Sequence, residues 1–128
     1  MREVYRDFVL PLHKELNREF PGKLILHCCG NTEDRVHYFS QANFLVYHFE
    51  SANDIRKIIE GAAGMTLSGC VNNPTTLYSG TPADVYAETE KILKEGILIL
   101  SPECAIPLSV NNENLKAIVE CAKNHKLN

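Results

Sequence analysis

Four short apolar segments, each followed by a stretch with helical periodicity, constrain the fold of this sequence most. They cover residues 23–29, 43–49, 65–71 and 97–100. The last is a run of consecutive aliphatic residues, which is typical of a strand covered on both faces. Strands that alternate with helices favour a parallel sheet with right-handed crossovers. The sequence therefore predicts an α/β fold with a parallel sheet of about four β/α units.

A first helix precedes these units. Residues 2–20 place Val4, Phe8, Leu12 and Leu16 at four-residue spacing, so one face is apolar and the helix is amphipathic. Pro11 removes a backbone donor inside this segment. We therefore expect a kink there or a split into two helices.

The clearest start signal of the later helices is at Thr81. Thr81 is a good N-cap, Pro82 suits the first helical position, and Asp84 stands three residues after the cap. Other helices are expected to start near Thr32, after Ser51 or Asn53 as N-cap candidates, and near Asn112. The inward positions predicted for the last two long helices are Val85, Thr89, Ile92 and Leu93, and then Leu115, Ile118, Val119 and Ala122.

Composition narrows the class of protein. The chain has 128 residues, 45% hydrophobic and 23% charged, with a formal net charge of -3. We expect a single domain over residues 1–128, with no basic surface for nucleic acid or anionic membrane. Its apolar runs fall short of the roughly 20 residues of a membrane span, and five cysteines are an odd number. A cytoplasmic protein with reduced thiols is therefore predicted.

Unusual polar residues gather where the predicted strands end. In parallel α/β proteins ligands bind at this carboxyl edge, because the loops that precede the helices meet there. All four segments therefore contribute residues to one predicted site. These residues are His27, Cys29, His48, Glu50, Ser68, Cys70, Asn72, Glu103 and Cys104.

Three of these residues could bind a metal. His27 and Cys29 are two positions apart, so on a strand both face the same side. Together with Cys104 they would give zinc three ligands and leave a fourth position open, which is typical of catalytic sites. By spacing alone, these three residues could equally be ordinary buried core residues. Burial is the preferred interpretation for Cys28, Cys70 and Cys121.

Five motifs resemble a known family. They are LHCCGN at 26–31, LSGCVN at 67–72, GTPADV at 80–85, ILSPECAIP at 99–107 and ENLK at 113–116. In this order they resemble the C-terminal part of the uroporphyrinogen decarboxylase superfamily. Within it, the sequence is most similar to the methylcobamide:coenzyme M methyltransferases of methanogenesis.

The resemblance implies a fold and a chemistry. These methyltransferases are (β/α)8 barrels that bind Zn²⁺ through a His-x-Cys pair and a later cysteine, which match His27, Cys29 and Cys104. They move a methyl group from a methylated corrinoid to a thiol such as coenzyme M. Zinc supports this chemistry because coordination lowers the pKa of a thiol. Glu50 matches an acidic position and is the predicted catalytic residue.

The substrate mouth departs from the family pattern. Ser68, Asn72 and Glu103 are the predicted substrate-binding residues. The family often has asparagine at the position of Cys70, aspartate at Asn72, and glycine at Glu103 and Ala105. The resemblance therefore leaves the acceptor thiol open.

The length of the chain departs further from the family pattern. A complete barrel needs about 250 residues, so 128 residues correspond to the C-terminal half. A half barrel exposes the edges of its first and last strands. Self-association, or pairing with a missing N-terminal half, is therefore predicted.

Two other functions fit the same sequence. The chain could be a catalytically silent zinc-binding or assembly domain. Uroporphyrinogen decarboxylase-like chemistry is disfavoured, because it needs no metal and leaves the His27, Cys29 and Cys104 pattern unexplained.

Overall fold

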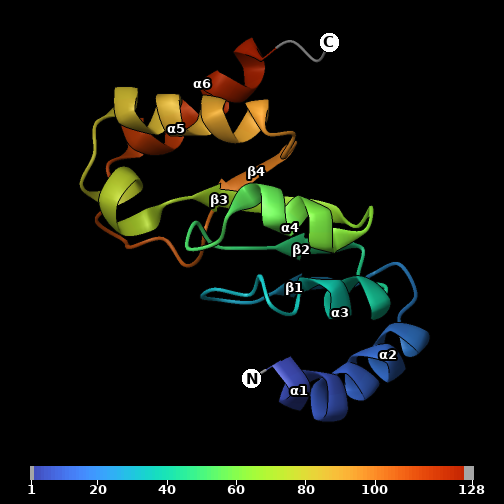
Figure 1. Ribbon diagram of the computed structural model, residues 1–128. Coiled ribbons are helices and arrows are strands. Elements are labelled where there is room, and N and C mark those ends of the chain that lie inside the picture. Colours follow the sequence, from blue (N-terminus) through green and yellow to red (C-terminus); the bar gives the residue numbers. More distant parts are fainter. Residues whose placement is uncertain (1, 126–128) are drawn as a thin grey trace. The chain divides into compact units, whose positions relative to one another are not determined.

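The computed structural model describes residues 2–125 and has one four-stranded sheet in the order β1-β2-β3-β4 (Figure 1). The strands are β1 (Ile25–His27), β2 (Val46–His48), β3 (Thr66–Val71) and β4 (Ile99–Pro102). β1 pairs with β2 in parallel, and β3 pairs with β4 in parallel. The predicted α/β fold with a four-stranded parallel sheet is confirmed. The chain divides into two compact units, Met1–Leu67 and Ser68–Asn128.

The first unit begins with a helical segment that changes type before Pro11. Its helices are α1 (Arg2–Val4), the π-helical turn η1 (Tyr5–Val9), α2 (Leu10–Glu19), α3 (Val36–Gln41) and α4 (Ile55–Ala62). In an α-helix the ring of Pro11 would clash with the carbonyl of Asp7. The wider π-helical turn covers Asp7, so the predicted interruption occurs as a local change of helix type.

The apolar face of this helical segment is exposed. Phe8 is 70% exposed and Leu12 63%, and Val4, Leu16 and Phe20 are also exposed. The opposite side carries Leu10, which packs in a cluster of buried residues. That cluster consists of Leu10, Tyr38, Ala42 and Phe44, with Tyr5, Leu24, Leu26 and Met65 packed against it.

Two helix starts in the first unit differ from the prediction. The helix expected near Thr32 begins at Val36, because the Thr32 carbonyl first accepts turn hydrogen bonds from the amides of Arg35 and Val36. The N-cap of α4 is Asp54, whose side chain accepts from the backbone N–H groups of Arg56 and Lys57. The predicted caps Ser51 and Asn53 were therefore wrong.

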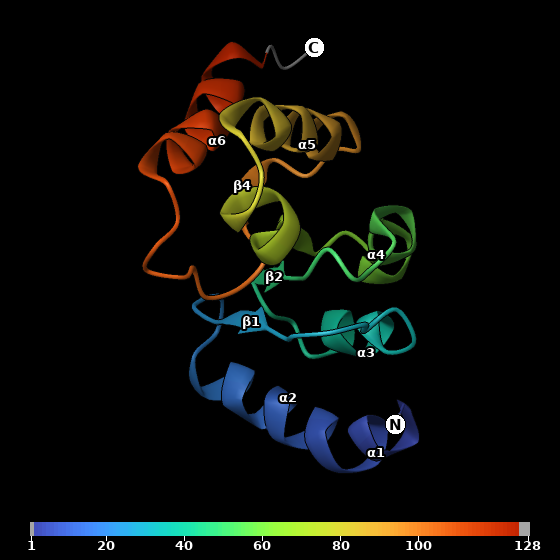
Figure 2. The same cartoon turned by 90° about the vertical axis from the view of Figure 1, so that its left-hand side faces the viewer.

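The second unit contains the π-helical turn η2 (Asn73–Tyr78), α5 (Pro82–Lys94) and α6 (Asn112–Asn124). α5 and α6 lie side by side in both ribbon views (Figures 1 and 2). The capping box predicted at Thr81 and Asp84 is present. The predicted inward face of α5 is also confirmed, since Val85, Thr89, Ile92 and Leu93 are buried.

Two predictions in the second unit were wrong. β4 covers Ile99–Pro102 rather than residues 97–100, and Leu98 and Ile99 are exposed, so this strand is not covered on both faces. In α6, the predicted inward residues Val119 and Ala122 are exposed. The buried residues are Asn114, Ala117, Ile118 and Cys121. The Asn114 side chain donates to the carbonyls of Leu77 and Gly80, which places a polar residue on the inward face.

No helix among residues 2–125 has the length and apolar character needed to cross a membrane.

Candidate metal centre

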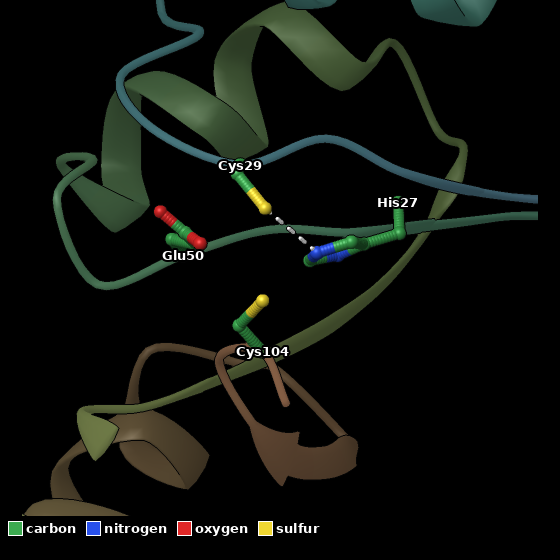
Figure 3. Close-up of side chains that lie close together, drawn as sticks. All are labelled: His27, Cys29, Glu50 and Cys104. Carbon is green, nitrogen blue, oxygen red and sulfur yellow. Dashed lines mark hydrogen bonds between the residues drawn. The ribbon is translucent and has the colours of Figure 1, made fainter. Parts of the chain in front are cut away.

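His27 and Cys29 lie together at the end of β1 (Figure 3). His27 is the last residue of the strand, and its Nε2 atom is 3.2 Å from Sγ of Cys29. Both side chains are exposed. The two side chains are close, as the sequence predicted, but strand alternation is not the reason, because Cys29 lies outside β1. Their role as ligands of one site stays a prediction.

Glu50 joins this pair from the loop after β2. Its Oε2 accepts a hydrogen bond of 2.6 Å from the Gly30 amide. Gly30 has φ +78, a conformation that favours glycine. One ligand atom each from His27, Cys29 and Glu50 lies within 4.8 Å of the other two. We call these three side chains the first-unit ligand group.

The donor set of this group fits zinc. Zn–N and Zn–S bonds of about 2.0 and 2.3 Å at a tetrahedral angle place the nitrogen and sulfur roughly 3.5 Å apart. The 3.2 Å between His27 Nε2 and Cys29 Sγ is close to that separation. Imidazole, thiolate and carboxylate are all zinc ligands. The first-unit ligand group therefore suits a metal of the zinc type.

Cys104 belongs to the second unit and is also drawn in Figure 3. It follows the end of β4 by two residues and is partly buried. The sequence predicted it as the third zinc ligand, and it keeps that status as a prediction.

The predicted substrate-binding residues lie in the second unit. Ser68 lies within β3, where its Oγ is 3.1 Å from Oγ of Ser101. Asn72 caps η2: its Oδ1 accepts from the Thr75 amide at 2.8 Å. The backbone N–H of Asn72 donates to Glu88.

Glu103 is buried rather than open at a mouth. Its Oε1 accepts a hydrogen bond of 2.9 Å from the Asn73 amide, and its own amide donates to the Val71 carbonyl. Glu103 therefore helps hold the turn that follows β3. Its substrate-binding role stays a prediction.

Comparison with known proteins identifies the family. The uroporphyrinogen decarboxylase family profile matches residues 1–125. The chain belongs to the uroporphyrinogen decarboxylase family.

Relatives in this family are methyltransferases of methanogens. The methylcobamide:CoM methyltransferase MtbA of Methanosarcina acetivorans is 30% identical over 127 residues, which is 97% of this chain and 38% of that protein. The methylated-thiol–coenzyme M methyltransferase of Methanosarcina mazei is 30% identical over 94% of this chain and 33% of its own length. This chain thus spans about a third of the length of these relatives.

A solved structure shares the fold. A methyltransferase from Methanosarcina mazei superposes with a TM-score of 0.88 at 26% identity, covering 95% of this chain and 37% of the other.

The other cysteines of this uroporphyrinogen decarboxylase family member are poor ligand candidates. Burial raises the pKa of the Cys70 thiol to about 12, and Glu88 and Glu103 add to the shift. Burial also raises the pKa of Cys28 and Cys121. A raised thiol pKa disfavours the thiolate that binds metals. The predicted burial is confirmed for Cys70 and Cys121, whereas Cys28 is only partly buried.

Proposed function

We propose that this chain carries the zinc-binding part of a methyltransferase that moves a methyl group from a methylated corrinoid to a thiol such as coenzyme M. One observation carries the proposal: His27 Nε2 and Cys29 Sγ are 3.2 Å apart beside the carboxylate of Glu50. The relatives named methylcobamide:CoM methyltransferases support the reaction class.

The proposed zinc ligands are His27, Cys29 and Cys104. His27 and Cys29 follow from the first-unit ligand group, and Cys104 follows from the motif resemblance. Three ligands of this kind leave a position for an incoming thiol. Zn²⁺ held there would lower the pKa of that thiol and favour the thiolate.

Glu50 has a proposed role in proton transfer. Its carboxylate lies within 4.8 Å of the ligand atoms of His27 and Cys29, and its Oε2 is held by a hydrogen bond from the Gly30 amide. Glu50 would accept the proton that the thiol releases. Ser68, Asn72 and Glu103 are proposed to line the approach of the thiol.

The transfer step balances without an added oxidant or reductant. The thiolate sulfur attacks the methyl carbon in line, and a sulfur–carbon bond forms. A methylated corrinoid would supply the methyl group and would keep the electron pair of the bond that it gives up. The role of this chain is to hold the sulfur in the orientation for that attack.

We also propose that residues 1–128 act as one cytoplasmic domain that self-associates or pairs with the rest of a barrel. The exposed apolar face of the first helical segment supports this, because contiguous exposed apolar side chains typically mark an interface. Light scattering at micromolar concentration tests it. A monomer at all concentrations would contradict self-association.

Metal content tests the ligand set. The native chain and a Cys104→Ser variant are purified with zinc available, and bound zinc is measured by mass spectrometry of the metal. We expect close to one zinc in the native chain and a clear loss in Cys104→Ser. No zinc in either protein would contradict the proposed site.

Activity separates an enzyme from a silent domain. Methylcobalamin and coenzyme M are supplied to the zinc-loaded chain, and loss of the methyl–cobalt bond is followed by absorbance. Methylation of the thiol, weakened in Glu50→Gln, is the expected result. Zinc binding without methyl transfer, even with the remaining part of a relative supplied, would instead favour a zinc-binding assembly domain.

A further inference from the structure

Asn53 connects the two loops that carry Cys29 and Glu50. It lies in the loop before α4 and is 6% exposed. Its Nδ2 donates to the carbonyl of Gly30 at 3.0 Å and to the carbonyl of Glu50 at 2.9 Å. One side-chain amide therefore holds the backbone next to Cys29 and the backbone of Glu50 itself.

The same amide also fixes the loop beyond Gly30. Asn53 Oδ1 accepts from the Thr32 amide at 2.7 Å and from the Thr32 hydroxyl at 3.1 Å. The Thr32 hydroxyl in turn lies 2.5 Å from the hydroxyl of Tyr47, which is fully buried. The network thus runs from the core of the first unit to the ligand-bearing loops.

The environment fixes the orientation of Asn53. An asparagine side chain has two N–H donors and two acceptor lone pairs, and these four hydrogen bonds use all of them. Rotating the amide by half a turn would set Oδ1 against two carbonyl oxygens. Aspartate has the same shape but lacks the donors, so it could not hold both carbonyls.

We infer that Asn53 is a positioning residue for the metal centre. It does not belong to the ligand group itself. By holding the Gly30 and Glu50 carbonyls, it fixes the distance between Cys29 and the Glu50 carboxylate. The direct hydrogen bond from the Gly30 amide to Glu50 Oε2 depends on the same distance. The inference rests on the proposed zinc site, because it assigns Asn53 the role of a residue that orients the ligands.

Metal affinity is the first test. Zn²⁺ is titrated into the metal-free native chain and Asn53→Asp in competition with a chelator dye. Loss of a residue that orients metal ligands typically weakens binding about 10- to 100-fold, and we expect a decrease in that range. An affinity within about twofold of native would overturn the inference.

Asn17 offers a matched control. It is also an asparagine of the first unit with 6% exposure, and its Nδ2 donates only to the His13 carbonyl among the described hydrogen bonds. Asn17→Asp makes the same chemical change at the same burial, on a helix that carries none of the ligand group. Its zinc affinity should stay within about twofold of native.

A second measurement needs no metal. Amide hydrogen exchange is recorded for Gly30, which donates to Glu50, and for Ile58, a buried residue of α4 whose amide donates to Asp54. In Asn53→Asp we expect the ratio of the Gly30 exchange rate to the Ile58 exchange rate to rise about tenfold or more above its native value. Equal acceleration at both amides would mean a general loss of stability and would overturn the positioning role.

The two measurements separate two failures. If the native chain binds no zinc, the proposed function fails, and the ratio of Gly30 to Ile58 exchange still decides whether Asn53 positions the loops. If Asn53→Asp does not fold, Thr32→Val takes its place. That variant removes one acceptor contact of Asn53 and should show a smaller change in the same direction. An unchanged exchange ratio in folded Thr32→Val would overturn the inference.

Discussion

The loops after β1 and β2 in the first unit contrast with those after β3 and β4 in the second. In the first unit, His27 and Cys29 are exposed, and their ligand atoms lie beside Glu50. In the second unit, Glu103 is buried and accepts from the Asn73 amide, while Asn72 caps η2. In the first pair of loops a histidine, a thiol and a carboxylate lie close together, whereas in the second pair Asn72 and Glu103 hold the backbone of their own unit.

The difference shows that a polar residue at a strand end has two possible uses. Glu50 and Glu103 both follow a strand and both accept a backbone N–H. Glu50 accepts from Gly30 next to a thiol and an imidazole, so its carboxylate remains part of a ligand group. Glu103 is surrounded by the chain that it supports. Position after a strand therefore does not by itself assign a function.

The largest effect is expected at Cys29, in the first pair of loops. Structural zinc sites with four protein ligands supply about 10–16 kcal/mol, which is roughly 3 kcal/mol per ligand. Loss of one of the three proposed ligands here should therefore weaken binding about 100-fold or more. Cys29→Ser is expected to lose zinc affinity by this amount. Because Cys29 is exposed, the free energy of unfolding without metal should change little. Dye competition and urea unfolding measure the two quantities.

Cys28→Ser is the control for that prediction. It makes the same change one residue away, at a thiol whose pKa is raised mainly by burial. Zinc affinity within about twofold of native is expected. An equal loss of affinity in Cys28→Ser would show that the two positions do not differ as the structure indicates.

The second prediction concerns Asn114 in the second unit. Asn114 is almost fully buried and donates at 2.9 Å to both the Leu77 and Gly80 carbonyls. Asn114→Ala leaves two acceptors unpaired, and we expect a loss of about 2 kcal/mol in the free energy of unfolding. Zinc affinity should not change, in contrast to the effect at Asn53. A weaker zinc site in Asn114→Ala would break the distinction between the two asparagines.

The sequence predicted the regular parts of this architecture well. The four strands and the α5 helix followed from apolar runs and from the Thr81 capping box, because these signals are local. His27 and Cys29 were predicted to face one site, and their atoms are close. The exact strand limits were not predictable, since pairing with neighbouring strands decides where a strand ends.

The role of Asn53 could not be predicted from the sequence. Its four side-chain hydrogen bonds reach residues more than 20 positions away as well as Glu50 nearby, and no local pattern marks such a network. An asparagine before a helix is normally interpreted as an N-cap. The adjacent Asp54 takes that role, which leaves the Asn53 amide for the loops.

The third prediction compares helix caps in the two units. Asp54 accepts from two N–H groups of α4, and Thr81 forms a capping box with Asp84 in α5. Replacing either N-cap with alanine should lower the free energy of unfolding by about 1 kcal/mol. Thermal unfolding measures both variants. Since Asp54 follows Asn53 directly, only Asp54→Ala should also alter zinc affinity. A native zinc affinity in Asp54→Ala would limit the positioning role to Asn53 itself.

The smallest effect is expected from pH in the first unit. Burial lowers the pKa of His13, whose Nδ1 is 2.7 Å from the Tyr5 hydroxyl. A depressed pKa means that the folded state favours the neutral ring, so stability is full above the ordinary histidine pKa of about 6.5 and falls as pH drops through the lowered value. Urea unfolding at neutral and mildly acidic pH should show this loss. His13→Gln should flatten it without abolishing it, because the pKa of His37 is lowered too, by burial and by Arg2. If stability falls as steeply with pH in His13→Gln as in the native chain, a group other than His13 causes the loss.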